Sequence, residues 1–343
     1  MKVFVNAYLE NNLGDDLFFD ILKNRYSRNK FYVMSSSIKN EDNVVVYKNK
    51  FLNKLIRRFE LKKFLTNKCD VIVSIGGSMY MEQKNDTNRK FFLGKKPYYI
   101  LGSNFGPYHT ETYYKNAHKF FEKAEDVCFR DKYSYNLFSD IKAVRYAPDI
   151  IFTLDTKNLE KVQNTKRAIF SIISCRDKVN VKYEEEYKNA IIDMTKKLID
   201  DGYKITYMSF CKNENDELAI EEILEKIDNN IKKYIETYYY RGNIKEAIEV
   251  LNNSDIIVGT RFHSIILGML LNKTVIPIIY SDKTKHMLED FKFNGKTVDI
   301  RNLDNYNIEE LFTDENKKYK LNIEKIKEEA EEQFRELDKV LKS

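Results

Sequence analysis

Three residues in the stretch 255–280, DIIVGTRFHSIILGMLLNKTVIPIIY, have side chains or backbone positions that could bind an anion and move a proton. Thr260, Arg261 and His263 lie between a short apolar run and an apolar run long enough for about three helical turns. They are therefore expected at the carboxyl end of a strand and in the first turn of a helix, where N–H groups and the helix dipole attract an anion. Arg261 adds a positive charge, and His263 would gain a proton when a dianion binds and then act as a general acid.

Each of these residues also has an ordinary structural interpretation. Arg261 could form a surface ion pair, and a lone histidine on an apolar helix is usually a packed ring with satisfied nitrogens. Function is favoured for His263 because the chain has only four histidines and this one is two positions from an arginine at a strand end. Lys283 follows the apolar run TVIPIIY, and its ordinary interpretation is a solvated residue at the start of a helix. A functional role is favoured only if it lies beside Arg261 and His263.

A second group of candidates follows strand-like runs in the N-terminal half. Arg130 and Asp131 end the run DVCFRD, so the arginine forms either a structural contact with that aspartate or one side of an anion clamp facing Arg261. Gly77 and Ser78 belong to the turn that ends the buried strand expected in CDVIVSIGGSMY, and Asn104 lies at the end of the strand expected in PYYILGSNFGPY. These turns are either plain tight turns or, because they should share one sheet edge, the lining of a binding pocket.

The first turn of the chain is polar. Asn12, Gly14 and Asp15 lie between the apolar run 2–7 and the helical pattern LFFDILKNRY. One interpretation is a helix N-cap with favourable acidic residues. The other is a ligand contact in which the carboxylate of Asp15 orients or deprotonates a sugar hydroxyl.

Several enzyme classes leave signatures that this sequence lacks. It has no Walker A loop, no GxGxxG after the first strand, no HExxH, no GxSxG and no DxD pair for metal-held nucleotide sugars. We therefore expect no metal site, and chemistry on an anionic or sugar substrate that needs no metal.

The elements that must position these residues alternate between strand and helix. Runs apolar enough to be buried on both faces predict mostly parallel sheets, in which ligands bind outside the carboxyl ends of strands. The alternation occurs twice, at 1–154 and 167–320, around a polar linker at 155–166. The segment 321–343 has a narrow apolar stripe typical of a helix that docks across the other domain. The predicted fold class is α/β, with two Rossmann-like lobes in a GT-B-like architecture and the site in an interlobe cleft.

Composition sets broad limits on compartment and partners. The 343 residues carry a net charge of only +5, spread along the chain, which argues against a nucleic-acid partner. No apolar run approaches the roughly 18 residues of a spanning helix, and the start is too polar for a signal peptide. The cysteines are far apart on strand-like runs and are expected to be reduced and buried: Cys69, Cys128, Cys175 and Cys211. A cytoplasmic location is predicted.

In combination, these motifs resemble the polysaccharide pyruvyl transferase family. The resemblance covers about residues 6–291 and rests on NNLGDD, SIGGSMY, GSNFGPY, CFRDKYSYNLF, APDI and VGTRFHSIILGMLLNKTVIPIIYSDKTK. The Arg-x-His turn followed by helix, strand and a lysine-bearing loop is the most specific of them. The acidic first turn departs from the usual pattern, with Asn11 where glycine is common and Asp16 where glutamate is common.

The resemblance implies a GT-B-like fold, phosphoenolpyruvate as co-substrate without a further cofactor, and a pyruvate ketal on two hydroxyls of a sugar. It places the donor site on Arg130, Arg261 and His263, with Lys283 less firmly placed. The acceptor would be a lipid-linked or nucleotide-linked sugar, and a lipid-linked one would bring the protein to the inner membrane surface. The alternatives are a GT-B glycosyltransferase that uses a nucleotide sugar and a catalytically silent glycan-binding subunit.

Overall fold

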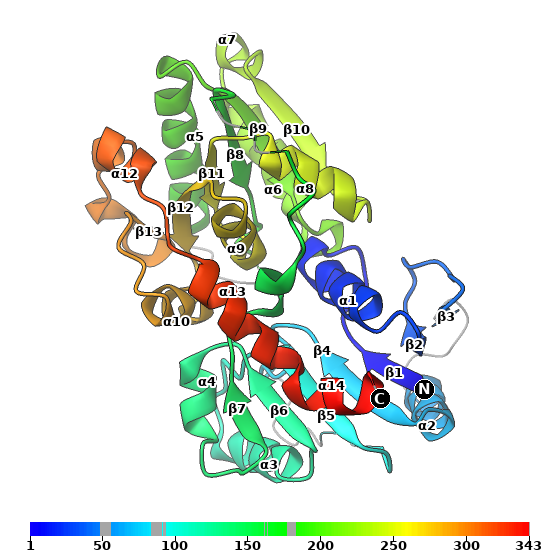
Figure 1. Ribbon diagram of the computed structural model, residues 1–343. Coiled ribbons are helices and arrows are strands. Elements are labelled where there is room, and N and C mark those ends of the chain that lie inside the picture. Colours follow the sequence, from blue (N-terminus) through cyan, green and yellow to red (C-terminus); the bar gives the residue numbers. More distant parts are fainter. Residues whose placement is uncertain are drawn as a thin grey trace. The chain divides into compact units, whose positions relative to one another are not determined.

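The computed structural model describes residues 1–48, 56–83, 91, 94–160, 162, 164–176 and 183–342 (Figure 1). The chain divides into two compact units. Unit 1 contains Met1–Glu10, Asp15–Leu154 and Glu324–Ser343, and unit 2 contains Asn11–Gly14 and Asp155–Ile323.

The described part of unit 1 is built on one sheet in which all neighbouring strands are parallel. Its order is β3-β2-β1-β4-β5-β6-β7. The strands are β1 (Lys2–Asn6), β2 (Lys30–Met34), β3 (Val44–Tyr47), β4 (Val71–Ile75), β5 (Tyr98–Ser103), β6 (Asp126–Phe129) and β7 (Val144–Tyr146). The helices are α1 (Leu13–Arg25), α2 (Ile56–Lys68), α3 (Glu111–Phe121), α4 (Lys132–Leu137) and the short η1 (Ile150–Thr153). Every residue of β4, β5 and β6 is buried, as expected for central strands of a parallel sheet.

Unit 2 repeats the design with a second parallel sheet, ordered β10-β9-β8-β11-β12-β13 among the described residues. The strands are β8 (Arg167–Ser171), β9 (Lys204–Ser209), β10 (Ile235–Tyr239), β11 (Ile256–Gly259), β12 (Thr274–Ile279) and β13 (Val298–Asp299). The helical elements are α5 (Glu184–Asp200), η3 (Lys212–Glu214), α6 (Asp216–Lys226), α7 (Asn229–Lys232), α8 (Ile244–Asn252), α9 (Phe262–Leu270), α10 (Asp282–Asp290), η4 (Ile300–Asn305), α11 (Ile308–Leu311) and α12 (Asp314–Lys318).

Both sheets have the doubly wound order. In each sheet the first strand, β1 or β8, lies in the middle and the next two strands are added on one side of it. The following strand, β4 or β11, then pairs with the other side of the first strand. This is the Rossmann arrangement, so the predicted α/β class with two Rossmann-like lobes is confirmed, whereas the expected cleft between the lobes stays a prediction. The points where the order reverses, between β1 and β4 and between β8 and β11, are where such sheets bind ligands.

The division into units differs from the expected boundaries at two places. Residues 11–14, expected in the N-terminal lobe, belong to unit 2, because the Leu13 N–H donates to the Phe210 carbonyl (3.1 Å). The segment 155–166, expected as a linker, is grouped with unit 2 and has no regular element among its described residues.

The C-terminal segment, expected at 321–343 to dock across the lobes, belongs to unit 1 from Glu324 onward. It forms α13 (Glu324–Glu331), the short η5 (Glu332–Phe334) and α14 (Arg335–Leu341). The Gln333 side chain fixes it in unit 1, since its Oε1 accepts from the Gly102 N–H (2.9 Å) and its Nε2 donates to the Ala147 carbonyl (2.7 Å). The apolar stripe noted in the sequence is buried at Ile326, Ala330, Phe334, Leu337 and Leu341.

The four cysteines are buried free thiols, as predicted. No helix in the described ranges combines the length and apolar character needed to cross a bilayer.

Candidate functional site

The turn after β11 places Arg261 in a buried ion-pair cluster. Its Nε donates to Asp216 Oδ2 (2.9 Å), its Nη1 to Glu214 Oε2 (2.7 Å), and its Nη2 to Asp216 Oδ1. The arginine is 7% exposed and Asp216 is fully buried. Burial alone would lower the pKa of Arg261, but the two carboxylates outweigh it and hold that pKa well above its ordinary value. Arg261 is thus a permanently charged group in a fixed orientation rather than a surface ion pair.

Asp216 is itself anchored by the backbone. As the first residue of α6 it accepts the N–H groups of Phe210 (3.0 Å) and Cys211 (2.9 Å), which follow β9. A carboxylate that accepts four donors in the protein interior is satisfied only while Arg261 stays in place. The cluster therefore ties the end of β9 to the end of β11.

The polar first turn of the chain lies in the same cluster. The Asn12 Nδ2 donates to Glu214 Oε1 (2.9 Å), and its Oδ1 accepts the Gly14 N–H (3.1 Å). Gly14 in turn lies against the His263 ring, whose Nδ1, Cε1 and Cγ are the nearest atoms to the position of an added Cβ. Four of the residues selected from the sequence, Asn12, Gly14, Arg261 and His263, are thus brought together in unit 2.

Thr260 has a packing role in this structure. Its side chain is fully buried, and its hydroxyl lies 3.1 Å from the Tyr187 hydroxyl. The N–H groups of Thr260 and Arg261 both donate to Ser171 Oγ, at 3.0 and 3.1 Å. Ser171 ends β8, so these two N–H groups are already bound within the protein, just before α9 begins at Phe262. The hydroxyl of Ser264 continues the network by donating to the Arg261 carbonyl (2.6 Å).

Lys283 lies close to two aromatic rings of unit 2. It lies in the first turn of α10, and its Nζ is 5.9 Å from the centre of the Phe262 ring and 5.4 Å from that of Tyr280. Phe262 is the residue between Arg261 and His263, so the lysine lies near their turn.

Unit 1 assembles a second cluster at the carboxyl ends of β4, β5 and β6. Arg130, which follows β6, donates from Nη1 to Asp149 Oδ2 (2.9 Å) and from Nη2 to Asn104 Oδ1 (2.8 Å). Its guanidinium lies against Gly77, where an added Cβ would be 2.5 Å from Nη1. The Asn104 N–H donates to the Gly77 carbonyl (2.8 Å), so Gly77, Asn104 and Arg130 occur together as the shared sheet edge predicted.

The remaining candidates of unit 1 surround this edge. Asp15 Oδ1 is 3.3 Å from the position of an added Cβ at Gly76, beside the Gly77–Ser78 turn, and Ser78 is partly buried. The aspartate after Arg130, Asp131, is the N-cap of α4 and accepts the Ser134 N–H (2.8 Å).

Three carboxylates of the two clusters were not selected from the sequence: Asp149, Glu214 and Asp216. Asp149 follows β7 in the motif APDI, so its position after a strand was a usable signal. The other two lie in the polar run CKNENDELAI, which gives no sign that they meet an arginine so distant in the sequence. In the described ranges, no three His, Cys, Asp or Glu side chains are grouped to hold a metal ion.

The comparison that decides the family covers most of the chain. The family model for polysaccharide pyruvyl transferase matches residues 12–282. The chain belongs to this family. Membership places it among transferases of polysaccharide biosynthesis. The matched range includes every candidate residue named above except Lys283, which directly follows its last residue.

A curated relative agrees with this assignment. The chain is 22% identical over 284 residues to the amylovoran biosynthesis protein AmsJ of Erwinia amylovora, a match that covers 75% of this chain and 67% of that protein.

Solved structures with the same fold include sugar-nucleotide enzymes and glycosyltransferases. The UDP-GlcNAc 2-epimerase of Methanocaldococcus jannaschii has a TM-score of 0.61 at 12% identity, with 99% of this chain and 100% of that chain covered. A glycosyltransferase from Rickettsia africae has 0.56 at 12%, covering 99% and 97%. WaaG, a glycosyltransferase of lipopolysaccharide biosynthesis, has 0.58 at 10%, covering 99% of each chain. These likenesses establish the shared fold of this pyruvyl transferase family member.

Proposed function

We propose that this protein transfers the pyruvyl group of phosphoenolpyruvate to two hydroxyls of a sugar and forms a pyruvate ketal during cell-surface polysaccharide biosynthesis. The observation that carries the proposal is the convergence of the Asn12–Gly14 turn with Arg261 and His263 in unit 2. That cluster lies just beyond the end of β11, beside the point where the strand order of the second sheet reverses.

The reaction needs one group that donates a proton and cationic groups that bind the anionic phosphoenolpyruvate. A proton is added to the methylene carbon of phosphoenolpyruvate, a sugar hydroxyl attacks the adjacent carbon, phosphate leaves, and the second hydroxyl closes the ketal. The two hydroxyl protons are accounted for, because one enters the new methyl group and the other leaves on phosphate. No oxidant, reductant or further cofactor is required.

His263 is the proton donor in this proposal. Its Nδ1 edge faces Gly14, so the nitrogen on the other side of the ring, Nε2, is the one directed away from the α1 turn. Proton transfer from a positioned histidine contributes typically about a hundredfold to ten-thousandfold in rate. Gly14 is then a positioning residue, since any larger residue would displace the ring.

Arg261 and Arg130 bind the charges of the donor in this proposal. Three of the five guanidinium N–H groups of Arg261 are engaged by carboxylates in the described part of the chain, which leaves two for a ligand. Asp216 and Glu214 orient the guanidinium, a pre-organisation that suits bidentate recognition of phosphate or carboxylate. Arg130 is oriented in the same way by Asp149.

The other candidates are assigned to substrate contacts. Lys283 adds positive charge near the Arg261 turn, and Asn12 holds the turn that carries Gly14. Asp15 is assigned to a sugar hydroxyl.

The sheet-edge groups Gly77, Ser78 and Asn104 are also assigned to the substrate, whereas Thr260 keeps only the packing role described above. We propose that the sugar acceptor is lipid-linked or nucleotide-linked. The protein then acts in the cytoplasm, and at the inner membrane face when the acceptor is lipid-linked.

Replacement of His263 by alanine tests the central assignment. We expect His263→Ala to abolish turnover while phosphoenolpyruvate binding, measured by calorimetry, stays close to the wild-type value. Normal turnover in the variant would refute His263 as the acid. A thermal-shift measurement in parallel tests the alternative of a nucleotide-sugar glycosyltransferase, because phosphoenolpyruvate should raise the Tm of a pyruvyl transferase and leave that of such a glycosyltransferase unchanged.

A further inference from the structure

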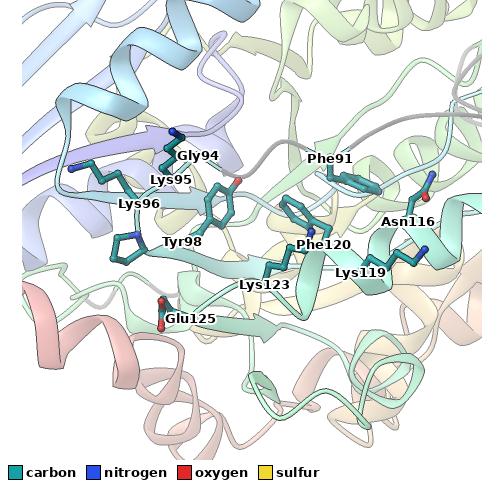
Figure 2. Close-up of a pocket in the computed structure, with 11 residues that line it drawn as sticks. Phe91, Gly94, Lys95, Lys96, Tyr98, Asn116, Lys119, Phe120, Lys123 and Glu125 are labelled. Carbon is teal, nitrogen blue, oxygen red and sulfur yellow. The ribbon is translucent and has the colours of Figure 1, made fainter.

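Unit 1 contains a pocket of about 890 Å³ that is separate from the candidate site. It lies at the amino-terminal end of β5, next to the C-terminal half of α3 (Figure 2). Its lining residues include four lysines, two phenylalanines and one tyrosine.

The pocket is at the opposite edge of the sheet from the Arg130 cluster. β5 starts at Tyr98 in the pocket and ends at Ser103, directly before Asn104. Five strand steps of about 3.3 Å separate the two ends by roughly 16 Å. Ligands of doubly wound sheets bind at the carboxyl edge, so the proposed transfer chemistry leaves this pocket unused.

The rim of the pocket carries uncompensated positive charge. Lys95, Lys96, Lys119 and Lys123 line it with a single carboxylate, Glu125. None of the four lysines forms an ion pair within the residues that the structure describes. Lysines elsewhere in the chain are commonly paired, as Lys115 on the same helix α3 is with Glu111 (2.8 Å). The excess of lysines over carboxylates makes the pocket complementary to an anion.

The floor of the pocket is aromatic. The Phe120 ring centre is 5.1 Å from that of Phe91 and 5.6 Å from that of Tyr98. In Figure 2 the rings of Tyr98 and Phe120 occupy the middle of the view, with Lys95 and Lys96 on one side and Lys119 on the other. Tyr98 and Phe120 are buried in the core of unit 1, so this floor is a rigid apolar surface.

We propose that this pocket binds an anionic amphiphile, with its phosphate or carboxylate on the lysines and its hydrocarbon part on the aromatic floor. The volume is in the range of small-molecule sites, which combine an apolar lining with a few polar groups. Neither part of the pocket suffices alone: an exposed lysine binds a simple anion weakly in water, and a neutral lipid would leave the lysines unused.

Calorimetry with three probes tests the proposal on the full chain: octyl phosphate, inorganic phosphate and octyl glucoside. We expect octyl phosphate to bind at least about tenfold more tightly than either of the other two, because only it engages both parts of the pocket. In the triple variant Lys95→Gln, Lys119→Gln, Lys123→Gln, we expect the affinity for octyl phosphate to fall about a hundredfold at low salt. Each lysine near an anionic lipid increases the affinity about fivefold. Equal binding of octyl phosphate and inorganic phosphate would overturn the proposal.

A matched control variant removes three other lysines. Lys39, Lys142 and Lys318 are exposed and have no carboxylate partner in the described ranges. Their replacement by glutamine changes the net charge by the same amount and should leave octyl phosphate binding unchanged. An equal loss in both triple variants would mean that overall charge, rather than this pocket, attracts the ligand. Because the readout is binding alone, the result does not depend on pyruvyl transfer.

Vesicles distinguish a membrane lipid from a soluble ligand. Co-sedimentation with phosphatidylglycerol vesicles that is lost in the pocket variant, with none on phosphatidylcholine, would assign the site to anionic membrane lipid. Octyl phosphate binding without any vesicle binding would assign it to a soluble amphiphile of the same chemistry. Tighter binding of a single-stranded oligonucleotide than of octyl phosphate would contradict both.

Discussion

The replacement Gly14→Ala perturbs the proposed acid without touching its side chain. An alanine Cβ at this position would lie 2.5 Å from His263 Cε1 and 2.6 Å from Cγ, and closer still to Nδ1. Real Cβ atoms essentially never come within 3.0 Å of another heavy atom, so the ring must move away. A displacement of about 1 Å from the productive geometry can cost about a hundredfold in rate. We therefore expect kcat to fall about a hundredfold.

The same substitution should be mild for the fold. Gly14 is the second residue of α1 and is not among the glycines with positive φ, so alanine fits the backbone there. Alanine favours a helix over glycine by about 1 kcal/mol, which offsets part of the cost of moving the ring. The Tm should therefore stay close to that of the wild type, and a loss of activity would not reflect unfolding.

The assay is steady-state release of phosphate from phosphoenolpyruvate with a sugar acceptor, together with calorimetric binding of phosphoenolpyruvate. If Gly14→Ala acts by displacing the His263 ring, kcat should fall while phosphoenolpyruvate binding stays close to the wild-type value. A kcat within about threefold of wild type, or a loss of phosphoenolpyruvate binding as large as the loss of kcat, would refute the assignment of Gly14 as a positioning residue.

Three further substitutions test the ion pairs. Asp216→Asn should destabilise the protein by about 3 kcal/mol in denaturant unfolding, because it leaves the buried Arg261 under-compensated. Asp149→Asn should lower the free energy of unfolding by about the same amount, because it leaves the buried Arg130 under-compensated. It should also weaken phosphoenolpyruvate binding in calorimetry. For Asp338, burial opposes ionisation but hydrogen bonds, chiefly from an arginine of α1, lower its pKa to about 2. The stability it adds is present above its unfolded pKa and lost as pH falls toward 2, so the Tm gap between wild type and Asp338→Asn should close over that range.

Each of these three predictions can be contradicted by a specific result. Asp131→Ala removes the N-cap of α4, so it should cost about 1 kcal/mol. A loss as large as that of Asp149→Asn would show that the buried pair of Arg130 and Asp149 contributes no more stability than a helix cap. An Asp216→Asn variant as stable as the wild type would show that Glu214 alone holds Arg261. Asp338 is partly exposed, so it should contribute no more than about 1 kcal/mol. A Tm gap that widens on acidification would contradict the sign of its pKa shift.

The strand-end candidates could be predicted because their signals are local. Arg261 and His263 follow a short apolar run and begin an apolar helix, and Gly77 and Asn104 follow buried strands of one sheet. Parallel strands bring their carboxyl ends to one edge, so the meeting of Gly77, Asn104 and Arg130 follows from the fold class. The family resemblance could be recognised from the sequence because its motifs are also local.

The partners of these residues could not be predicted, because they depend on long-range packing. Asp216 precedes Arg261 by 45 positions in a run that looks like an ordinary helix start. Nothing in the first turn indicates that the Leu13 N–H donates to Phe210, so its grouping with unit 2 was not anticipated. The N–H groups of Thr260 and Arg261 donate to Ser171, a serine without any distinguishing motif in the sequence.

The most direct test of the proposed transfer is to follow isotopically labelled phosphoenolpyruvate by NMR with a panel of lipid-linked and nucleotide-linked sugars. We predict that the vinyl signal of phosphoenolpyruvate is replaced by the methyl signal of a ketal on the sugar, with release of equimolar phosphate and with no product from His263→Ala. Consumption of a nucleotide sugar while phosphoenolpyruvate stays intact would contradict it.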